Sequence, residues 1–135
     1  MEKPKLAPGL EGKVEKVVPQ EWTIAAYDPR LPAVLSTPAM IGMMEVAAAR
    51  AVQPALEAGS MSVGTRIEVD HLKAVLAGTK VTATARLVEI GEKFLTFEVE
   101  ARSEADVIGR GRVFRAIVDY LRFQEKAREA TDAHG

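Results

Sequence analysis

Apolar and polar residues follow two different periods along this chain, and the change from one to the other comes at Gly59. Before it, a long apolar stretch has the spacing of a helix. After it, apolar and polar residues alternate, as in strands with one buried face. The alternation predicts strands at residues 60–76, 80–90, 94–101 and 108–123, after a weaker short strand at 11–18. Connections of hairpin length at 77–79 and 91–93 predict that the four later strands form an antiparallel meander.

The helical stretch carries very few charges. Between residues 38 and 52 only Glu45 and Arg50 are charged, so this helix is apolar on nearly all sides and should be buried on most of them. The step from Thr37 to Pro38 predicts its start, with a hydroxyl N-cap followed by a proline at the first helical position. Pro54 predicts that the regular helix ends or kinks just before it.

Length and composition describe one globular domain. A chain of 135 residues can bury a core of its own but is too short for two ordinary domains. Its 47% hydrophobic and 27% charged residues are close to the globular average and exclude a disordered chain. We expect a single domain over residues 1–135, with a loose arm at 1–9 and an irregular segment with a turn of helix at 22–32. A solvated tail at 125–135 should be either a helical turn or frayed.

Together these elements predict an α+β fold in which a curved antiparallel sheet of about five strands wraps one long central α-helix. A single sheet covers one side of such a helix and leaves the other side poorly covered. Because this helix is apolar on nearly all sides, its remaining face predicts a second copy of the chain, most simply related by a two-fold axis. We therefore expect a homodimer with the sheets edge to edge.

Several features are absent from the sequence, and each absence excludes a kind of site or partner. It contains no cysteine, which excludes disulfides, thiolate zinc sites and cysteine nucleophiles. Its 18 basic and 19 acidic residues balance, so no overall field attracts nucleic acid or an anionic membrane. The longest uncharged run, residues 31–44, contains two prolines and is too short to span a bilayer. We expect a cytoplasmic protein that binds no nucleic acid, no membrane, no metal and no cofactor.

Three side chains could carry chemistry, and each also has a structural explanation. Glu45 is an acid in the middle of an apolar helix, so it is either a general base or nucleophile, or a buried anchor paired with a distant arginine. His71 follows Asp70 on a predicted strand and is either a general base or a half-exposed strand residue. Thr37 has a structural role as the expected N-cap of the helix.

The spacing of these residues is more specific than any one of them. Thr37 stands eight residues before Glu45, and then follow Ser62-Val63-Gly64-Thr65, His71, Ile108-Gly109, Gly111 and, in the last strand, Arg115. From about residue 14 to residue 123 this pattern resembles the fluoroacetyl-CoA thioesterase family of hot-dog proteins. The resemblance implies a hot-dog fold and the hydrolysis of an acyl-CoA thioester by a catalytic group of Thr37, Glu45 and His71. Coenzyme A then enters only as part of the substrate.

Thioester hydrolysis needs a nucleophile or activated water, a group that moves protons, and donors for the developing oxyanion. Glu45 and His71 can supply the first two, and the helix start can supply the third. Because Pro38 has no N–H, the oxyanion donor there would be the amide of Thr37 or of Ala39. Arg115 stands at the arginine position of the family and could hold amide or carbonyl groups of the substrate. The expected substrate-binding residues are Ala39, Gly64 and Arg115.

One distance limits how the catalytic residues can meet. Eight helical residues span about 12 Å, so Thr37 cannot touch Glu45 of the same straight helix. Either the segment before Pro38 folds back, or the site takes the two residues from opposite subunits of the dimer, as hot-dog thioesterases commonly do. Both arrangements stay open on the sequence.

The segment before Thr37 bears on the substrate. The fluoroacetyl-specific enzyme has lid phenylalanines there, whereas residues 28–35 contain no aromatic residue, and Pro38 stands in place of a glycine. The expected substrate is therefore a small or medium acyl-CoA. Two other functions fit the same residues: an acyl-CoA sensor or carrier without turnover, and a hot-dog enoyl-CoA hydratase or dehydratase, which the Asp70–His71 pair would suit.

Overall fold

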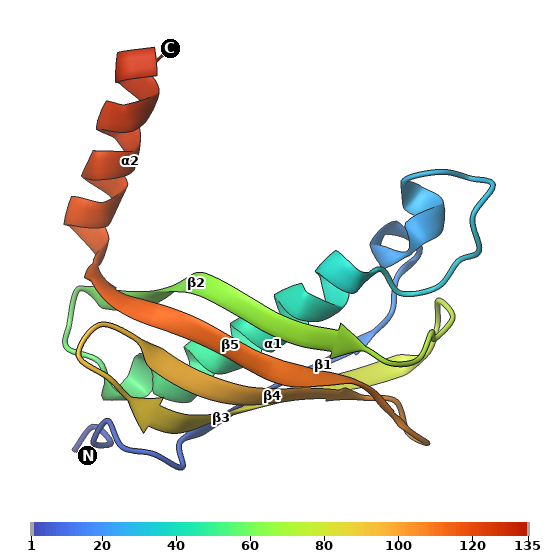
Figure 1. Ribbon diagram of the computed structural model, residues 1–135, viewed down its shortest axis with the longest axis horizontal. Coiled ribbons are helices and arrows are strands. Elements are labelled where there is room, and N and C mark those ends of the chain that lie inside the picture. Colours follow the sequence, from blue (N-terminus) through green and yellow to red (C-terminus); the bar gives the residue numbers. More distant parts are fainter. Residues whose placement is uncertain (1, 135) are drawn as a thin grey trace.

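The computed structural model describes residues 2–134, which form five strands and two α-helices (Figure 1). In chain order these are β1 (Glu11–Val17), α1 (Thr37–Val52), β2 (Ser60–His71), β3 (Lys80–Ile90), β4 (Leu95–Arg102), β5 (Val107–Asp119) and α2 (Tyr120–His134). Short 3₁₀ helices lie at Gln20–Trp22, Ile24–Ala26 and Gln53–Ala55. The strands form one antiparallel sheet in the order β1-β3-β4-β5-β2, which confirms the predicted α+β fold.

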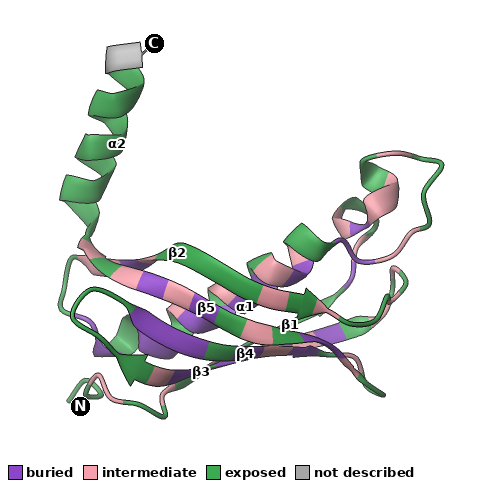
Figure 2. Cartoon of the chain, viewed as in Figure 1, coloured by how far each residue is buried: buried purple, intermediate pink, exposed green. Residues whose placement is uncertain are grey.

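The sheet curves around α1, as predicted, and buries one side of the helix (Figure 2). The buried helix residues recur at the three- and four-residue spacing of a single face: Met40, Met43, Met44, Ala47, Ala48, Ala51 and Val52. They belong to the same core as inward-facing strand residues such as Ala83, Ala85 and Phe97, all of which are buried. Small residues on both sides let the helix lie close to the sheet, so the core depends on their size.

The connection after β2 differs from the prediction. Its length predicted a hairpin from β2 to β3, but β2 pairs with β5, at the edge of the sheet opposite β1. After β2 the chain instead bonds to the segment that precedes α1, where Ala77 N–H donates to Ala33 O at 2.9 Å. The predicted meander is therefore right for β3, β4 and β5 and wrong for β2, which becomes an edge strand.

The end of the chain also differs from the prediction. β5 stops at Asp119 rather than at residue 123, so the first residues of α2 stand where we expected strand. From residue 125 on, the exposed helix agrees with the expected solvated helical turn, although α2 as a whole is longer than one turn. The carboxylate of Asp119 accepts a hydrogen bond from Arg122 N–H at 3.0 Å, the contact of an N-cap residue. This cap, and the helix-favouring Glu, Lys, Arg and Ala residues that follow, outweigh the apolar alternation that predicted strand.

Two local predictions are confirmed. The irregular segment at 22–32 contains the 3₁₀ turn Ile24–Ala26. α1 ends at Val52, and a 3₁₀ turn that includes Pro54 follows before Gly59, whose φ is 84°. Neither α-helix of the described chain is long and apolar enough to cross a bilayer.

Gly12 on β1 is the position where we expect the close packing of α1 to be most sensitive. A Cβ atom there would meet the carbonyl oxygen of Ala47 and would lie 2.6 Å from the amide nitrogen of Ala51. Gly12→Ala should therefore lower the free energy of unfolding by about 2 kcal/mol, the usual cost of overpacking. Urea unfolding measures the change. Lys13→Ala, on the exposed face of the same strand, is the control and should cost about 0.5 kcal/mol or less; equal midpoints for the two variants would contradict the prediction.

Candidate active site

Thr37 and His71 meet at the start of α1. Thr37 Oγ1 and His71 Nδ1 share a hydrogen bond of 2.8 Å. Thr37 is the first residue of α1 and His71 is the last residue of β2, so the pairing depends on where both elements end. The structure thus brings together two of the three predicted catalytic residues, which lie 34 positions apart in the sequence.

The cap of α1 explains why the Thr37 hydroxyl is free for this contact. We expected Thr37 to be the N-cap, but the cap is Ser36, whose Oγ accepts a hydrogen bond from Ala39 N–H at 3.2 Å. A serine in front of Thr37 takes over the capping role, and a hydroxyl that caps a helix is occupied by its amides. The same bond occupies the Ala39 amide, which was one of the two expected oxyanion donors.

The Thr37 amide is therefore the remaining donor at this end of α1. It has no hydrogen-bond partner within residues 2–134. The first amides of a helix point out along its axis, where the helix dipole favours negative charge. An oxyanion bound at the start of α1 would meet the Thr37 N–H.

The second ring nitrogen of His71 indicates that a ligand binds beside it. Nε2 is buried and has no hydrogen-bond partner in the described part of the chain, although buried polar atoms in folded proteins are nearly always paired. A cavity of about 310 Å³ lies beside this histidine. It is lined by Ile24, Val34, Leu35, Thr37, His71, Leu72, Lys73 and Ala74.

Glu45 lies two turns further along α1 and pairs with Arg115. Arg115 Nη1 is 3.1 Å from Glu45 Oε2, while Arg115 Nε and Nη2 donate to the Oγ and the carbonyl oxygen of Ser62, each at 2.8 Å. Arg115 is only 7% exposed, so it is not an ordinary surface arginine. Because its guanidinium is fixed by Ser62, it fixes the Glu45 carboxylate in turn.

Arg115 binds one oxygen of Glu45 and leaves the other free. Glu45 Oε1 is buried and unpaired among the residues that the structure describes. Gly64 makes room for the carboxylate, because a Cβ atom at this position would meet Glu45 Oε2. Arg115 and Gly64, which we expected to bind substrate, thus both act on Glu45. Ser62 was missed as a functional residue, and the available signal was its place two residues before Gly64, on the same face of β2.

The structure therefore contains two groups rather than one. Thr37 pairs with His71, and Glu45 pairs with Arg115. Both groups lie along α1, eight residues or about 12 Å apart. The segment before Pro38 does not fold back toward Glu45, since α1 already begins at Thr37. A single chain does not bring Glu45 to Thr37.

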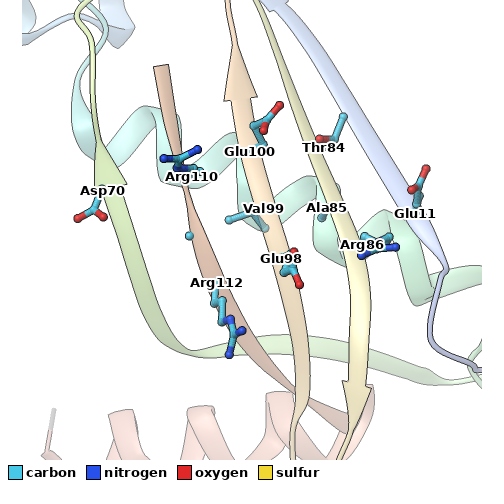
Figure 3. A pocket seen from close by; sticks show the side chains of 11 residues that line it. Glu11, Asp70, Thr84, Ala85, Arg86, Glu98, Val99, Glu100, Arg110 and Arg112 are labelled. Carbon is cyan, nitrogen blue, oxygen red and sulfur yellow. The ribbon is translucent and has the colours of Figure 1, made fainter. Parts of the chain in front are cut away.

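A hollow of about 740 Å³ lies elsewhere, on the face of the sheet that is turned away from α1 (Figure 3). Charges of alternating sign line it in two rows across the strands, Arg86, Glu98 and Arg112 in one and Glu100, Arg110 and Asp70 in the other. Opposite charges on neighbouring strands stabilise a sheet. The hollow includes none of the three predicted catalytic residues, so we assign its charges a structural role.

Nearly the whole chain is similar to known thioesterases. The family model described as fluoroacetyl-CoA-specific thioesterase matches residues 18–120. A fluoroacetyl-CoA thioesterase from Streptantibioticus cattleyicolor is 37% identical over 123 residues, which cover 87% of this chain and 88% of that protein. A solved variant of a fluoroacetyl-CoA thioesterase in complex with acetyl-CoA is 34% identical, with a TM-score of 0.87 over 93% of this chain and 99% of that one. A thioesterase-superfamily protein from Thermus thermophilus is 28% identical, with a TM-score of 0.85 over 98% of this chain and 96% of that one.

These matches confirm the resemblance that the sequence pattern indicated. The residues matched by the family model include both the Thr37–His71 pair and the Glu45–Arg115 pair. The matched structures cover almost the entire sheet together with α1. The chain therefore belongs to the family of fluoroacetyl-CoA-specific thioesterases, which are thioester hydrolases with the hot-dog fold.

Proposed function

We propose that this protein hydrolyses the thioester of a small or medium acyl-CoA and that Thr37, Glu45 and His71 form its catalytic group. One observation carries the proposal. Among the side chains of residues 2–132, the buried polar atoms without a hydrogen-bond partner are Glu45 Oε1 and His71 Nε2. Such atoms are rare, because each costs about 1–3 kcal/mol. Both belong to the candidate group, which supports a site that completes its hydrogen bonds with a substrate.

The Thr37–His71 pair can provide a nucleophile and its base. In the neutral tautomer with the proton on Nε2, the Thr37 hydroxyl donates to Nδ1, and the imidazole is placed to take that proton. Thr37 Oγ1 would then attack the thioester carbon, the C–S bond would break, and the proton would leave on the thiol of CoA. Water would hydrolyse the acyl-threonine and release the acid.

Glu45 offers a second route. Its carboxylate can attack the thioester carbon, or its free Oε1 can take a proton from an attacking water, while Arg115 holds Oε2. In either route the carbonyl oxygen gains negative charge, and the Thr37 amide at the positive end of α1 is placed to stabilise it. A covalent acyl intermediate would be carried by Thr37 in the first route and by Glu45 when its carboxylate attacks.

The acyl group fits the cavity beside His71. Its volume of about 310 Å³ lies at the lower end of the range for ligand pockets. Ile24, Val34 and Leu35 give it an apolar wall. The size and the polarity of this cavity therefore favour a short acyl chain. Residues 28–35, which precede Thr37, contain no aromatic side chain that would select a fluorinated acyl group.

Thr37 and Glu45 must approach each other for one site to form, and we propose that they come from two chains of a homodimer. The exposed side of α1 carries Pro38, Gly42 and Val46, which form a stripe at four-residue spacing. Val46 is 44% exposed, and Gly42 allows close packing. Two copies of α1 packed antiparallel about an axis at residues 41–42 would place Thr37 of each chain opposite Glu45 of the other.

The edge of β2 supports the same assembly. β2 has 12 residues, and none of the described strands pairs with its outer side. A long unpaired edge is a template for pairing with another chain. Because the outer face of the sheet is lined with charges, the edge of β2 together with the stripe on α1 is the surface that favours a dimer.

Glu45→Gln should lower kcat for acyl-CoA hydrolysis by about 10²–10⁴-fold, because the amide can neither attack nor take a proton. Release of thiol from acyl-CoA esters of increasing chain length measures the rate. Glu98→Gln makes the same change on the outer face of the sheet and should leave the rate unchanged. Wild-type rates for Glu45→Gln on every ester would overturn the catalytic group. Binding of CoA esters by the wild-type protein without release of thiol would identify a sensor or carrier instead.

Thr37→Val and Thr37→Ser test the hydroxyl. Valine has the shape of threonine without the oxygen, so turnover should fall by about 10²-fold or more, whereas serine keeps the bond to His71 and should stay within about tenfold of wild type. Mass spectrometry of protein quenched during turnover locates the acyl group. An adduct on Glu45, together with an active Thr37→Val variant, would exclude the route through Thr37.

Mixed dimers test whether the site spans two chains. Glu45→Gln and Thr37→Val chains are each expected to be inactive, but a dimer of one with the other holds one complete site if the two residues act across the interface. Mixing should therefore restore thiol release. Light scattering should show about twice the chain mass of 14.6 kDa. A monomer, or a mixed dimer without activity, would contradict the two-chain site.

A further inference from the structure

Helix α2 packs on little of its own chain. Its contacts are mainly with the end of β5, and it stands away from the sheet, beyond the edge strand β2 (Figure 1). The large apolar side chains of its first turn are exposed: Tyr120 (48%), Leu121 (73%) and Phe123 (41%). An isolated helix of about 15 residues is only marginally stable in water. A helix of this length with exposed apolar side chains needs another surface to pack on.

The place of that surface follows from the proposed dimer, on which this inference rests. α1 and β2 run antiparallel, because the first residue of α1 meets the last residue of β2, and Glu45 faces Gly64 further along. A two-fold axis that passes α1 at residues 41–42 therefore passes β2 near Ile67. Pairing of β2 with its copy about this axis would set the first residue of each strand beside residues 72–75 of the partner subunit.

The start of α2 lies beside the first residue of β2. Asp119 pairs with Ser60 in the sheet, and Tyr120 N–H donates to Gly59 O at 2.9 Å. The 15 residues of α2 measure about 22 Å, enough to cross four strands spaced about 4.8 Å apart. Because α2 projects past the outer side of β2, it extends toward the space that the second copy occupies (Figure 1).

The second copy has a matching apolar surface at this place. Leu72 and Leu76 follow β2 and are 48% and 64% exposed, and Leu72 also lines the cavity beside His71. We propose that α2 of each chain packs, chiefly through Leu121, on this segment of the other chain and covers the cavity beside its Thr37–His71 pair. α2 is then a wall of the substrate site that is supplied in trans and holds the acyl group in position beside the Thr37–His71 pair.

Engineered disulfides test the placement of α2 without reference to activity. The chain has no cysteine, so Leu121→Cys combined in turn with Leu72→Cys and with Leu76→Cys introduces a single pair each time. Within one chain, position 121 lies at one end of β2 and positions 72 and 76 follow its other end. A 12-residue strand measures about 36 Å, far beyond the reach of a disulfide, so any bond must join two chains.

Mild oxidation should convert at least one of these pairs into a disulfide-linked dimer on a non-reducing gel. The matched control is Leu121→Cys with Val17→Cys, which is 58% exposed on the opposite edge of the sheet and should stay monomeric on the same gel. The single-cysteine variants control for bonds between like positions. Linkage no stronger than in these controls would overturn the placement.

Leu121→Asp tests the functional role. Aspartate in the first turn is compatible with the helix, so circular dichroism should show unchanged helix content, while kcat/KM for acyl-CoA should fall by about tenfold. Mixing this variant with Thr37→Val should recover thiol release, since the Thr37 site of one chain then receives an intact α2 from the other. Full activity of Leu121→Asp, or no recovery on mixing, would overturn a wall supplied in trans.

These outcomes separate this inference from the proposed function. A wild-type protein that releases thiol from no acyl-CoA would remove the proposed function, and the disulfides would still report where α2 packs. A wild-type protein with turnover, no disulfide link and an unaffected Leu121→Asp variant would remove the role of α2 alone.

Discussion

One sheet can cover only one side of α1, and the rest of the molecule depends on that limit. The covered side is built from methionine and alanine residues that allow close packing, and Gly12 on β1 brings a strand against the helix backbone. The other side keeps Val46 and Gly42 in solvent. Glu45 lies between these two sides, with 24% of its side chain exposed. A carboxylate in that position can be fixed by the buried Arg115 and can still contact a ligand that approaches from the solvent side.

The constant rise per residue of α1 then sets the distance between the two parts of the site. Thr37 and Glu45 are held about 12 Å apart because each helical residue adds about 1.5 Å. Each is oriented by a different strand, Thr37 by the end of β2 and Glu45 by Arg115 on β5. The same spacing that separates them in one chain suits an antiparallel pair of helices, in which each residue lies opposite the other. The proposed dimer and the proposed wall formed by α2 both follow from this geometry.

Much of the fold could be predicted because periodicity is a local property. Side chains alternate along a strand and repeat every three to four residues along a helix whatever the rest of the chain does. The strand boundaries of β3 and β4 and the end of α1 before Pro54 follow from such local signals. The errors arose where two local signals competed. Ser36 and Thr37 both offered a cap, and Asp119 started a helix where apolar alternation continued toward Phe123.

Residue types and their spacing were enough to predict the α+β class, the apolar helix with its single acid, and a family pattern that includes Thr37, Glu45 and His71. Three features became visible only in the folded chain: which strand β2 pairs with, which hydroxyl is free to meet His71, and that Arg115, fixed by Ser62, holds Glu45. Among these side-chain contacts, Thr37 and His71 lie 34 positions apart and Glu45 and Arg115 lie 70 positions apart. No local propensity specifies them, because such contacts form only when the packing of the whole core has set the distance between their elements.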